Sequence, residues 1–381
     1  MISEANILPA RRNSIAEILK RHWLPLVLAL TVLTRIPFLW TGYGADYDAW
    51  LVAKSGLTLW NTGIYHESRL PGYPLHEIVS APLVGLGGSV LSNSATLVIT
   101  LIAILVWSKI VQKVGTHHKL LVVAFAFAPV VWQHSAVTLD YMWSMLFVLV
   151  AVYALLDSRV LLSGVALGLA AGFRPSNFII IIPLACLTYL QSRRPRQLAI
   201  LLLSAATVSA ISFTPLIYKF GLPGWVIATQ AKMSDVTDPT MSMRVISFTY
   251  RLIYFVGPIS MVVAVYSLWR GRGSLKGAMQ SREPILVTSI VGTIVVLLLF
   301  LWLPLERAYL LPAFPFLLLI LDKVSSTRTF AIFTMCLIMS ALVNFDVIDA
   351  NTRRTFHPNI HPGMVIEELA NRKSIAPLDR K

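Results

Sequence analysis

The stretch from Gly44 to Glu77 holds most of the side chains in this chain that could do chemistry. It collects acidic, basic and imidazole groups beside several tyrosines: Asp46, Asp48, Glu67, Arg69, His76 and Glu77. Carboxylates can bind sugar hydroxyls or accept their protons, and aromatic rings offer an apolar face for a pyranose ring. The stretch therefore predicts a sugar site. The equal alternative is an ordinary polar loop whose aspartates cap a helix that begins near Ala49.

Two familiar metal motifs do not explain this stretch. The run Asp46-Tyr47-Asp48 looks like the DxD motif of nucleotide-sugar enzymes, but that pattern fixes only two positions. The loop is also predicted below to face outward, where nucleotide sugars are scarce. His76 and Glu77 do not start a zinc motif, because position 80 is Ser80 and a second histidine is missing. We therefore infer neither a manganese–nucleotide site nor a zinc site from these residues.

Two further charged residues stand at the ends of apolar runs. Asp140 either lies in the headgroup zone or points into a helix bundle, where a carboxylate is a functional candidate. Arg174 could clamp a phosphate through its planar guanidinium, or it could extend toward lipid headgroups. The run before it has glycines at four-residue spacing, which allow close helix contact: Gly164, Gly168 and Gly172.

An acid–base pair, Glu306 and Arg307, lies in the short turn between two apolar runs that ends at Pro312. Both could simply be solvated turn residues. A turn this short has little need of both charges, however, and this favours a functional role. By contrast, we interpret His117, His118 and the run Arg193-Arg194-Pro195-Arg196 as determinants of membrane topology only.

The elements that must position these residues are membrane helices. Hydrophobic residues make up 56% of the chain and charged residues only 13%, whereas a soluble domain has roughly 25% charged residues. The apolar residues fall in long runs with basic residues at the joints between them. The net charge of +14 therefore indicates membrane orientation and anionic lipid rather than nucleic acid. The two cysteines, Cys186 and Cys336, lie inside apolar runs and are interpreted as packing residues.

The pattern predicts an all-α, polytopic transmembrane bundle of about eleven spans. The domain boundaries are a cytoplasmic tail over 1–22, a transmembrane domain over 23–345 with a first outer loop at 42–93, and an outer tail over 346–381. Amphipathic stretches at Ala49–Leu59 and His76–Leu86 predict helices that lie along the membrane surface. The predicted spans are 23–41, 94–112, 119–135, 140–156, 160–173, 177–190, 198–217, 246–268, 285–303, 308–321 and 329–345.

The distribution of lysine and arginine sets the orientation. With the N-terminus in the cytoplasm, the inner joints hold 17 basic residues and the outer segments before the C-terminal tail hold nine. Inner loops carry the excess of positive charge in membrane proteins. The chain is therefore predicted in the cell (inner) membrane, with the first loop, Arg174 and Arg307 on the outer face.

Taken together, three segments resemble the GT-C superfamily, the polytopic glycosyltransferases that use lipid-phosphate sugars. The first is the loop with Asp46, Asp48 and the run Ser68-Arg69-Leu70-Pro71-Gly72-Tyr73-Pro74, and the second is Gly164–Arg174 before Pro175. The third is Glu306-Arg307-Ala308-Tyr309-Leu310-Leu311-Pro312, which looks like the late turn of mannosyltransferase-like members. The likeness is spread over most of the chain. Tyr47 separates acids that are often adjacent in the family, and the large C-terminal domain of some members is reduced to a tail.

The resemblance implies an inverting transfer of a sugar from a polyprenyl-phosphate donor to an acceptor hydroxyl at the outer face. Asp48 or Asp46 would accept the hydroxyl proton, and arginines would stabilise the departing phosphate. The arginine candidates are Arg174, Arg307 and Arg69. The residues expected to bind substrate are Tyr73, His76, Glu77, Asp140 and Glu306.

The expected partners are membrane lipid, the polyprenyl-phosphate sugar, and a glycan, lipid or protein acceptor. A cationic clamp can replace a metal, so the resemblance requires no cofactor and leaves a divalent ion open. The alternative function is a carrier or flippase for a lipid-linked sugar, without bond chemistry. Such proteins usually place charge or broken helices near the bilayer midplane, whereas the polar residues here cluster toward one face. A structural subunit of an envelope assembly is a third possibility, with no specific support.

Overall fold

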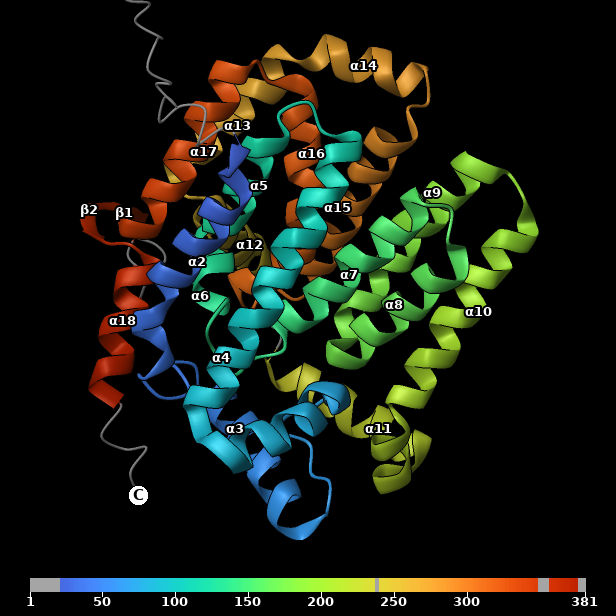
Figure 1. The fold of residues 1–381 in the computed structure, drawn as a ribbon, viewed down its shortest axis with the longest axis vertical. Helices are drawn as coiled ribbons and strands as arrows, with labels where there is room; N and C mark the ends of the chain where they lie inside the picture. Colours follow the sequence, from blue (N-terminus) through green and yellow to red (C-terminus); the bar gives the residue numbers. More distant parts are fainter. Residues whose placement is uncertain (1–20, 237–239, 349–355, 376–381) are drawn as a thin grey trace, which may run out of the picture.

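A computed structural model of the chain describes residues 21–236, 240–348 and 356–375. The described part is a bundle of helices, and most of them run lengthwise (Figure 1). The elements are α2 (Trp23–Leu39), α3 (Tyr47–Thr62), α4 (Pro74–Val114), α5 (His118–Phe127), α6 (Pro129–His134), α7 (Tyr141–Leu156), α8 (Val160–Phe173), the 3-10 helix η1 (Pro175–Ile180), α9 (Ile181–Ser192), α10 (Pro195–Ser212), α11 (Thr214–Val236), α12 (Met241–Val256), α13 (Pro258–Arg270), α14 (Arg272–Gln280), α15 (Pro284–Trp302), the 3-10 helix η2 (Arg307–Ala313), α16 (Phe314–Val324), α17 (Thr327–Leu342), β1 (Val343–Ile348), β2 (Phe356–Pro362) and α18 (Met364–Ile375).

The helical fold class is confirmed, but the predicted number of about eleven spans is not supported. Within the described ranges, four helical segments are long and apolar enough to cross a membrane, and a fifth forms if α12 and α13, bent by 92°, count as one span. Several other apolar helices have only 10–17 residues, fewer than the ~20 that a bilayer needs. The four segments are Pro74–Val114, Pro175–Ser192, Pro195–Ser212 and Pro284–Trp302.

The first loop is more helical than predicted. The predicted helix His76–Leu86 lies in the first part of α4, and a kink at Gly88 separates this part from the rest of the element. At Gly88 the backbone leaves helical geometry with φ of +57°, which glycine tolerates because it has no Cβ. Helix α3 corresponds to the predicted Ala49–Leu59. It packs closely on α4, since a Cβ on Gly56 would lie 3.2 Å from the backbone of Ser80.

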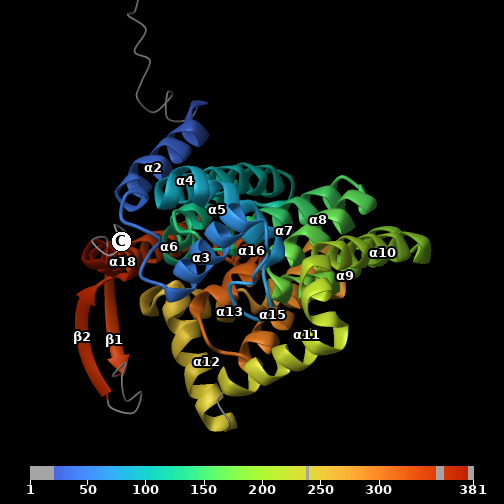
Figure 2. The ribbon, with the colours of Figure 1, turned by 90° about the horizontal axis from the view of Figure 1, so that it is seen from below.

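The two ends of the bundle carry different elements. Helix α14 crosses one end, and α3 and α11 lie at the other (Figure 1). Viewed from below, α3, α11 and α12 are on the near side of the molecule (Figure 2). The α3 end therefore combines the first loop with the connections around α11.

The C-terminal region is folded and not a simple tail. Strands β1 and β2 pair antiparallel in a small hairpin after α17, and α18 packs against α6 and α2. The described residues of the predicted outer tail, 346–348 and 356–375, therefore form parts of the two strands and α18. Residues 349–355 and 376–381 of the predicted outer tail, and residues 1–20 of the predicted cytoplasmic tail, lie outside the described part of the chain.

The glycine spacing predicted from the sequence does bring two helices together. A Cβ on Gly168 of α8 would lie 2.6 Å from the Cβ of Val208 and 2.9 Å from the carbonyl oxygen of Ala205, both on α10. At Gly164 the corresponding atom would lie 2.7 Å from the carbonyl oxygen of Leu201. The glycines therefore permit a contact between α8 and α10 that no larger side chain allows without movement of the backbone.

Gly168→Ala is expected to destabilise the protein by about 1–3 kcal/mol, because it overpacks this contact. Thermal unfolding in detergent should show a fall of several degrees in the midpoint. Gly277→Ala on α14 is the matched control, since nothing lies within 4 Å of a Cβ there. Equal midpoints for the two variants would show that the α8–α10 contact is not tight.

Candidate functional site

A cavity of about 860 Å³ opens among the elements at the α3 end of the bundle. Its walls come from α3, the 68–73 loop, the junction of α8 and η1, α11, α15, and the 303–312 turn. These walls include residues from all three segments on which the resemblance was based. Predicted site residues that line the cavity are Asp48, Arg69, Tyr73, Arg174 and Glu306.

An ion-pair network connects residues from three of these segments. Asp140 is fully buried, and its two carboxylate oxygens accept hydrogen bonds from Arg69 at 2.7 Å and from Arg174 at 2.5 Å. Arg69 also reaches Asp48, with 2.8 Å between Nε and Oδ2. The ion pairs thus run continuously from Asp48 through Arg69 and Asp140 to Arg174. Of the two positions predicted for Asp140, the headgroup zone and the inside of the helix bundle, the structure shows the second.

The network explains how these charges can be buried. A buried ion is stable only when opposite charge and hydrogen bonds replace its hydration. Asp140 meets this condition with one guanidinium on each carboxylate oxygen. Arg174, only 4% exposed, therefore does not extend toward lipid headgroups. Each guanidinium has five N–H donors, more than its contacts with Asp48 and Asp140 use.

Tyrosine rings surround the two guanidinium groups. The guanidinium carbon of Arg69 lies 3.9 Å from the ring centroid of Tyr73, and that of Arg174 lies 3.9 Å from Tyr141 and 4.7 Å from Tyr309. Rings at these distances attract a cation and restrict its side chain. The Tyr141 hydroxyl donates a hydrogen bond to Glu306. The turn with Glu306 is thereby joined to the network.

The two aspartates of the first loop have different positions. Asp46 is the N-cap of α3, and its Oδ1 accepts a hydrogen bond of 2.9 Å from the backbone N–H of Asp48. Asp48 lies in the first turn of α3 and lines the cavity. The capping alternative therefore holds for Asp46, whereas Asp48 has direct access to a bound molecule.

Burial, followed by the negative charges of Glu306 and Asp48, raises the pKa of Asp46 to about 6. The ordinary value is 3.8, so between these limits the folded state binds more protons than the unfolded state. Stability then falls as the pH rises through this window.

Asp46→Asn should therefore raise the unfolding midpoint at pH 7.5, by about 1–3 °C, because asparagine still caps the helix and carries no buried charge. The gain should shrink as the pH is lowered to 5, where wild-type Asp46 becomes neutral. Differential scanning fluorimetry across this pH range measures it. A constant or inverted difference between the two proteins would contradict the raised pKa.

Five predicted site residues lie outside the cavity lining: Asp46 and Asp140, described above, and Glu77, His76 and Arg307. Glu77 is buried and accepts hydrogen bonds of 2.6 Å from both the backbone N–H and the hydroxyl of Ser68, so it fixes the loop that carries Arg69. His76 is buried in the first turn of α4 with its ring edge against Trp143. Arg307 begins η2 directly after Glu306 and is half-buried. The structure thus brings five of the ten predicted residues into the cavity wall and pairs Asp140 with two of them. It places Asp46, Glu77, His76 and Arg307 nearby, outside the lining.

Part of the cavity lining is apolar. It is formed mainly by residues of α15 and its C-terminal end: Val296, Leu299, Phe300, Trp302 and Leu303. Trp302 is also 52% exposed on the outside of the bundle, and it continues a stripe with Leu298 and Ile294 at four-residue spacing. The cavity lining therefore contains both charged and apolar side chains, and Trp302 joins it to an exposed apolar face of α15.

Sequence reasoning did not select several residues of the site. Tyr141 and Tyr309 contact Arg174, and Lys232 of α11 lines the cavity. Tyr141 directly follows Asp140, and Tyr309 lies in the late turn three residues after Glu306. Their positions next to predicted site residues could have indicated that they belong to the site. Lys232 had no such signal, because α11 lies outside the three resembling segments.

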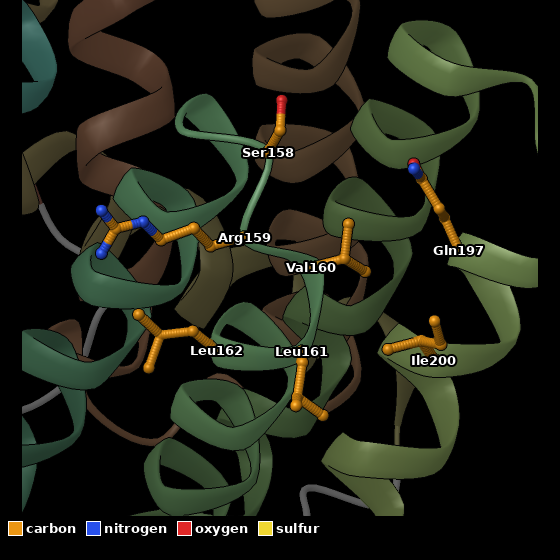
Figure 3. Close-up of a pocket in the computed structure, with 7 residues that line it drawn as sticks. All are labelled: Ser158, Arg159, Val160, Leu161, Leu162, Gln197 and Ile200. Atoms are coloured by element: carbon orange, nitrogen blue, oxygen red, sulfur yellow. The ribbon is translucent and has the colours of Figure 1, made fainter.

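A second depression lies elsewhere, between the start of α8 and α10, with a volume of about 470 Å³. The close-up shows that the Arg159 guanidinium points away from Gln197 and that most of the other labelled side chains are aliphatic (Figure 3). It contains no convergent polar groups. Within the described ranges, no group of three or more His, Cys, Asp or Glu side chains is arranged to hold a metal ion.

The charged cavity at the α3 end is therefore the candidate site. Comparison of the chain with protein-family models, with curated proteins and with solved structures gives no match.

Proposed function

We propose that this protein is a membrane glycosyltransferase that moves a sugar from a polyprenyl-phosphate donor to an acceptor hydroxyl. The observation that carries the proposal is one cavity lined by Asp48, Arg69, Arg174 and apolar residues of α15, in which the Asp48 carboxylate pairs with the Arg69 guanidinium. A lipid phosphate has both features in one molecule. Its anionic head matches the arginines, and its hydrocarbon chain matches α15 and the apolar helix face outside.

The proposed reaction uses one carboxylate and the arginines. The acceptor oxygen attacks the anomeric carbon from the face opposite the phosphate, and its proton passes to the carboxylate of Asp48. The bond between the anomeric carbon and the phosphate oxygen breaks, and polyprenyl phosphate leaves with the bonding electrons. Attack from the opposite face inverts the anomeric configuration.

The arginines act on the departing phosphate. Negative charge on it increases in the transition state, so fixed guanidinium donors stabilise that state more than the bound donor. Arg69 and Arg174 are held by Asp140 and by the tyrosine rings before any ligand binds. This preorganisation means that little reorganisation is needed during the reaction.

The proposal includes a multi-pass arrangement in the cell membrane, with the N-terminus in the cytoplasm and the cavity on the outer face. The unequal count of basic residues supports this orientation. The shorter apolar helices would cross together with the long ones by packing in one bundle, where a short helix is shielded by its neighbours.

Purified protein in lipid nanodiscs, incubated with a panel of polyprenyl-phosphate sugars and candidate acceptors, tests the function. We expect one donor to release polyprenyl phosphate in step with formation of a glycosylated acceptor. Donor movement across the bilayer of proteoliposomes without any transfer would favour the carrier alternative. Absence of both binding and transfer for every lipid-phosphate donor would refute the proposal.

A further inference from the structure

The C-terminal helix α18 contacts both the residue before Asp46 and helix α6. Glu368 is 7% exposed. One of its carboxylate oxygens accepts a hydrogen bond from the backbone N–H of Ala45, and the other accepts one from Nε2 of Gln133, each at 3.3 Å. Ala45 directly precedes Asp46, and Gln133 belongs to α6, ahead of the segment that leads to Asp140.

This contact comes from far along the chain. Glu368 and Ala45 are 323 positions apart, and Glu368 and Gln133 are 235 apart. Helix α18 lies against α6 at the edge of the bundle (Figure 2). A carboxylate offers only acceptors, so it suits a point where donors from two separate segments converge.

The segment before α3 is held from three directions. Trp50 donates its indole N–H to the carbonyl of Gly44 at 3.1 Å, and Asn93 of α4 donates to the carbonyl of Gly42 at 2.8 Å. The third contact is the hydrogen bond that the backbone N–H of Ala45 donates to Glu368. These contacts set where α3 begins, and the first turn of α3 carries Asp48.

We propose that Glu368 is a positioning residue for the proposed transfer reaction. It fixes the 42–48 segment against α6, so that Asp48 meets the acceptor hydroxyl at the correct distance. The inference rests on the proposed function for its kinetic consequence. Its structural part, immobilisation of the segment before α3 by α18, stands independently.

Glu368→Ala removes both acceptors and should loosen the segment. A shift of the order of 1 Å in a reacting group can lower turnover about 100-fold, so we expect kcat to fall about 10- to 100-fold. The KM for the lipid-phosphate donor should stay within about threefold of the wild type, because Arg69 and Arg174 are untouched. Glu368→Gln keeps one acceptor oxygen for the Ala45 N–H and should recover most of kcat.

Hydrogen–deuterium exchange provides a readout that needs no activity. In Glu368→Ala the amides over 42–50 should exchange at least several times faster, while those of α7 and α8 should be unchanged. Ala370→Gln is the control, since residue 370 is on the same helix and exposed. If the alanine variant does not insert, Glu368→Asp replaces it in both measurements, because its shorter side chain moves the carboxylate away from Ala45 and Gln133, and Glu368→Gln remains the variant expected to resemble the wild type.

Two results would overturn the inference. One is unchanged exchange over 42–50 in the alanine variant, and the other is a uniform rise over the whole protein, which marks a general loss of structure. If the wild type transfers no sugar, the proposed function fails, and the exchange measurement alone decides on the role of Glu368.

Discussion

Asp48→Asn should lower kcat for sugar transfer by a factor of about 10² to 10⁴, the range that a general base typically contributes. Asparagine has nearly the same shape and cannot accept the proton of the acceptor hydroxyl. Arg69 keeps its bond of 2.7 Å to Asp140, so donor binding should remain. Transfer of a radiolabelled sugar, measured with donor binding on the same preparation, separates the two effects.

Glu67→Gln is the matched control for this variant. Glu67 lies in the same loop and pairs with Lys219 at 2.5 Å, outside the cavity lining. It should transfer sugar at nearly the wild-type rate. If Asp48→Asn retains full turnover while Asp46→Asn loses it, the base is Asp46. If both variants and their double mutant keep full turnover, neither aspartate of this loop acts as the base.

Asp140→Ala should cause the largest loss of stability, about 3–5 kcal/mol, because breaking a buried ion pair leaves unpaired charge behind. Arg69 and Arg174 would then repel each other in a site with little water. The unfolding midpoint in detergent should fall by roughly 6 °C or more, and affinity for a lipid phosphate should drop. Thermal unfolding with and without the donor measures both quantities.

A double variant distinguishes charge from packing. Adding Arg174→Met to Asp140→Leu removes both members of one pair, and well-packed apolar residues often restore stability at such sites. We expect stability to recover and transfer to stay absent. Asp157→Asn is the control, because Asp157 pairs with Lys113 at a more exposed position and should leave the midpoint unchanged. A midpoint for Asp140→Ala equal to that of Asp157→Asn would contradict the buried network.

The sequence predicted the composition of the site better than its geometry. Charged residues at the ends of apolar runs are expensive to bury, so Asp140 and Arg174 could be selected from their context alone. Asp48 and Arg69 could be selected because the first loop collects acidic, basic and aromatic groups. The order in which they contact one another could not. That Asp140 lies between two arginines depends on the packing of α7 and α8 on α4 and the 68–73 loop.

The span count and the C-terminal region show what hydropathy misses. A hydropathy pattern finds apolar stretches, but it does not separate a short buried helix such as α5 from a helix that crosses a membrane alone. Likewise, Glu368 lies in a polar segment that looks like a tail. Its contact with Ala45 is formed only by tertiary structure.

Photo-crosslinking with a polyprenyl phosphate that carries a diazirine near its phosphate tests the central claim most directly. The claim is that the charged cavity binds the phosphate end of the lipid while α15 contacts the chain. We predict labelled peptides from 69–73, 174–179 and 299–309, competed by unlabelled polyprenyl phosphate and lost in Arg174→Gln. Labelling spread over the apolar surface, without competition and without any label in those three segments, would contradict it.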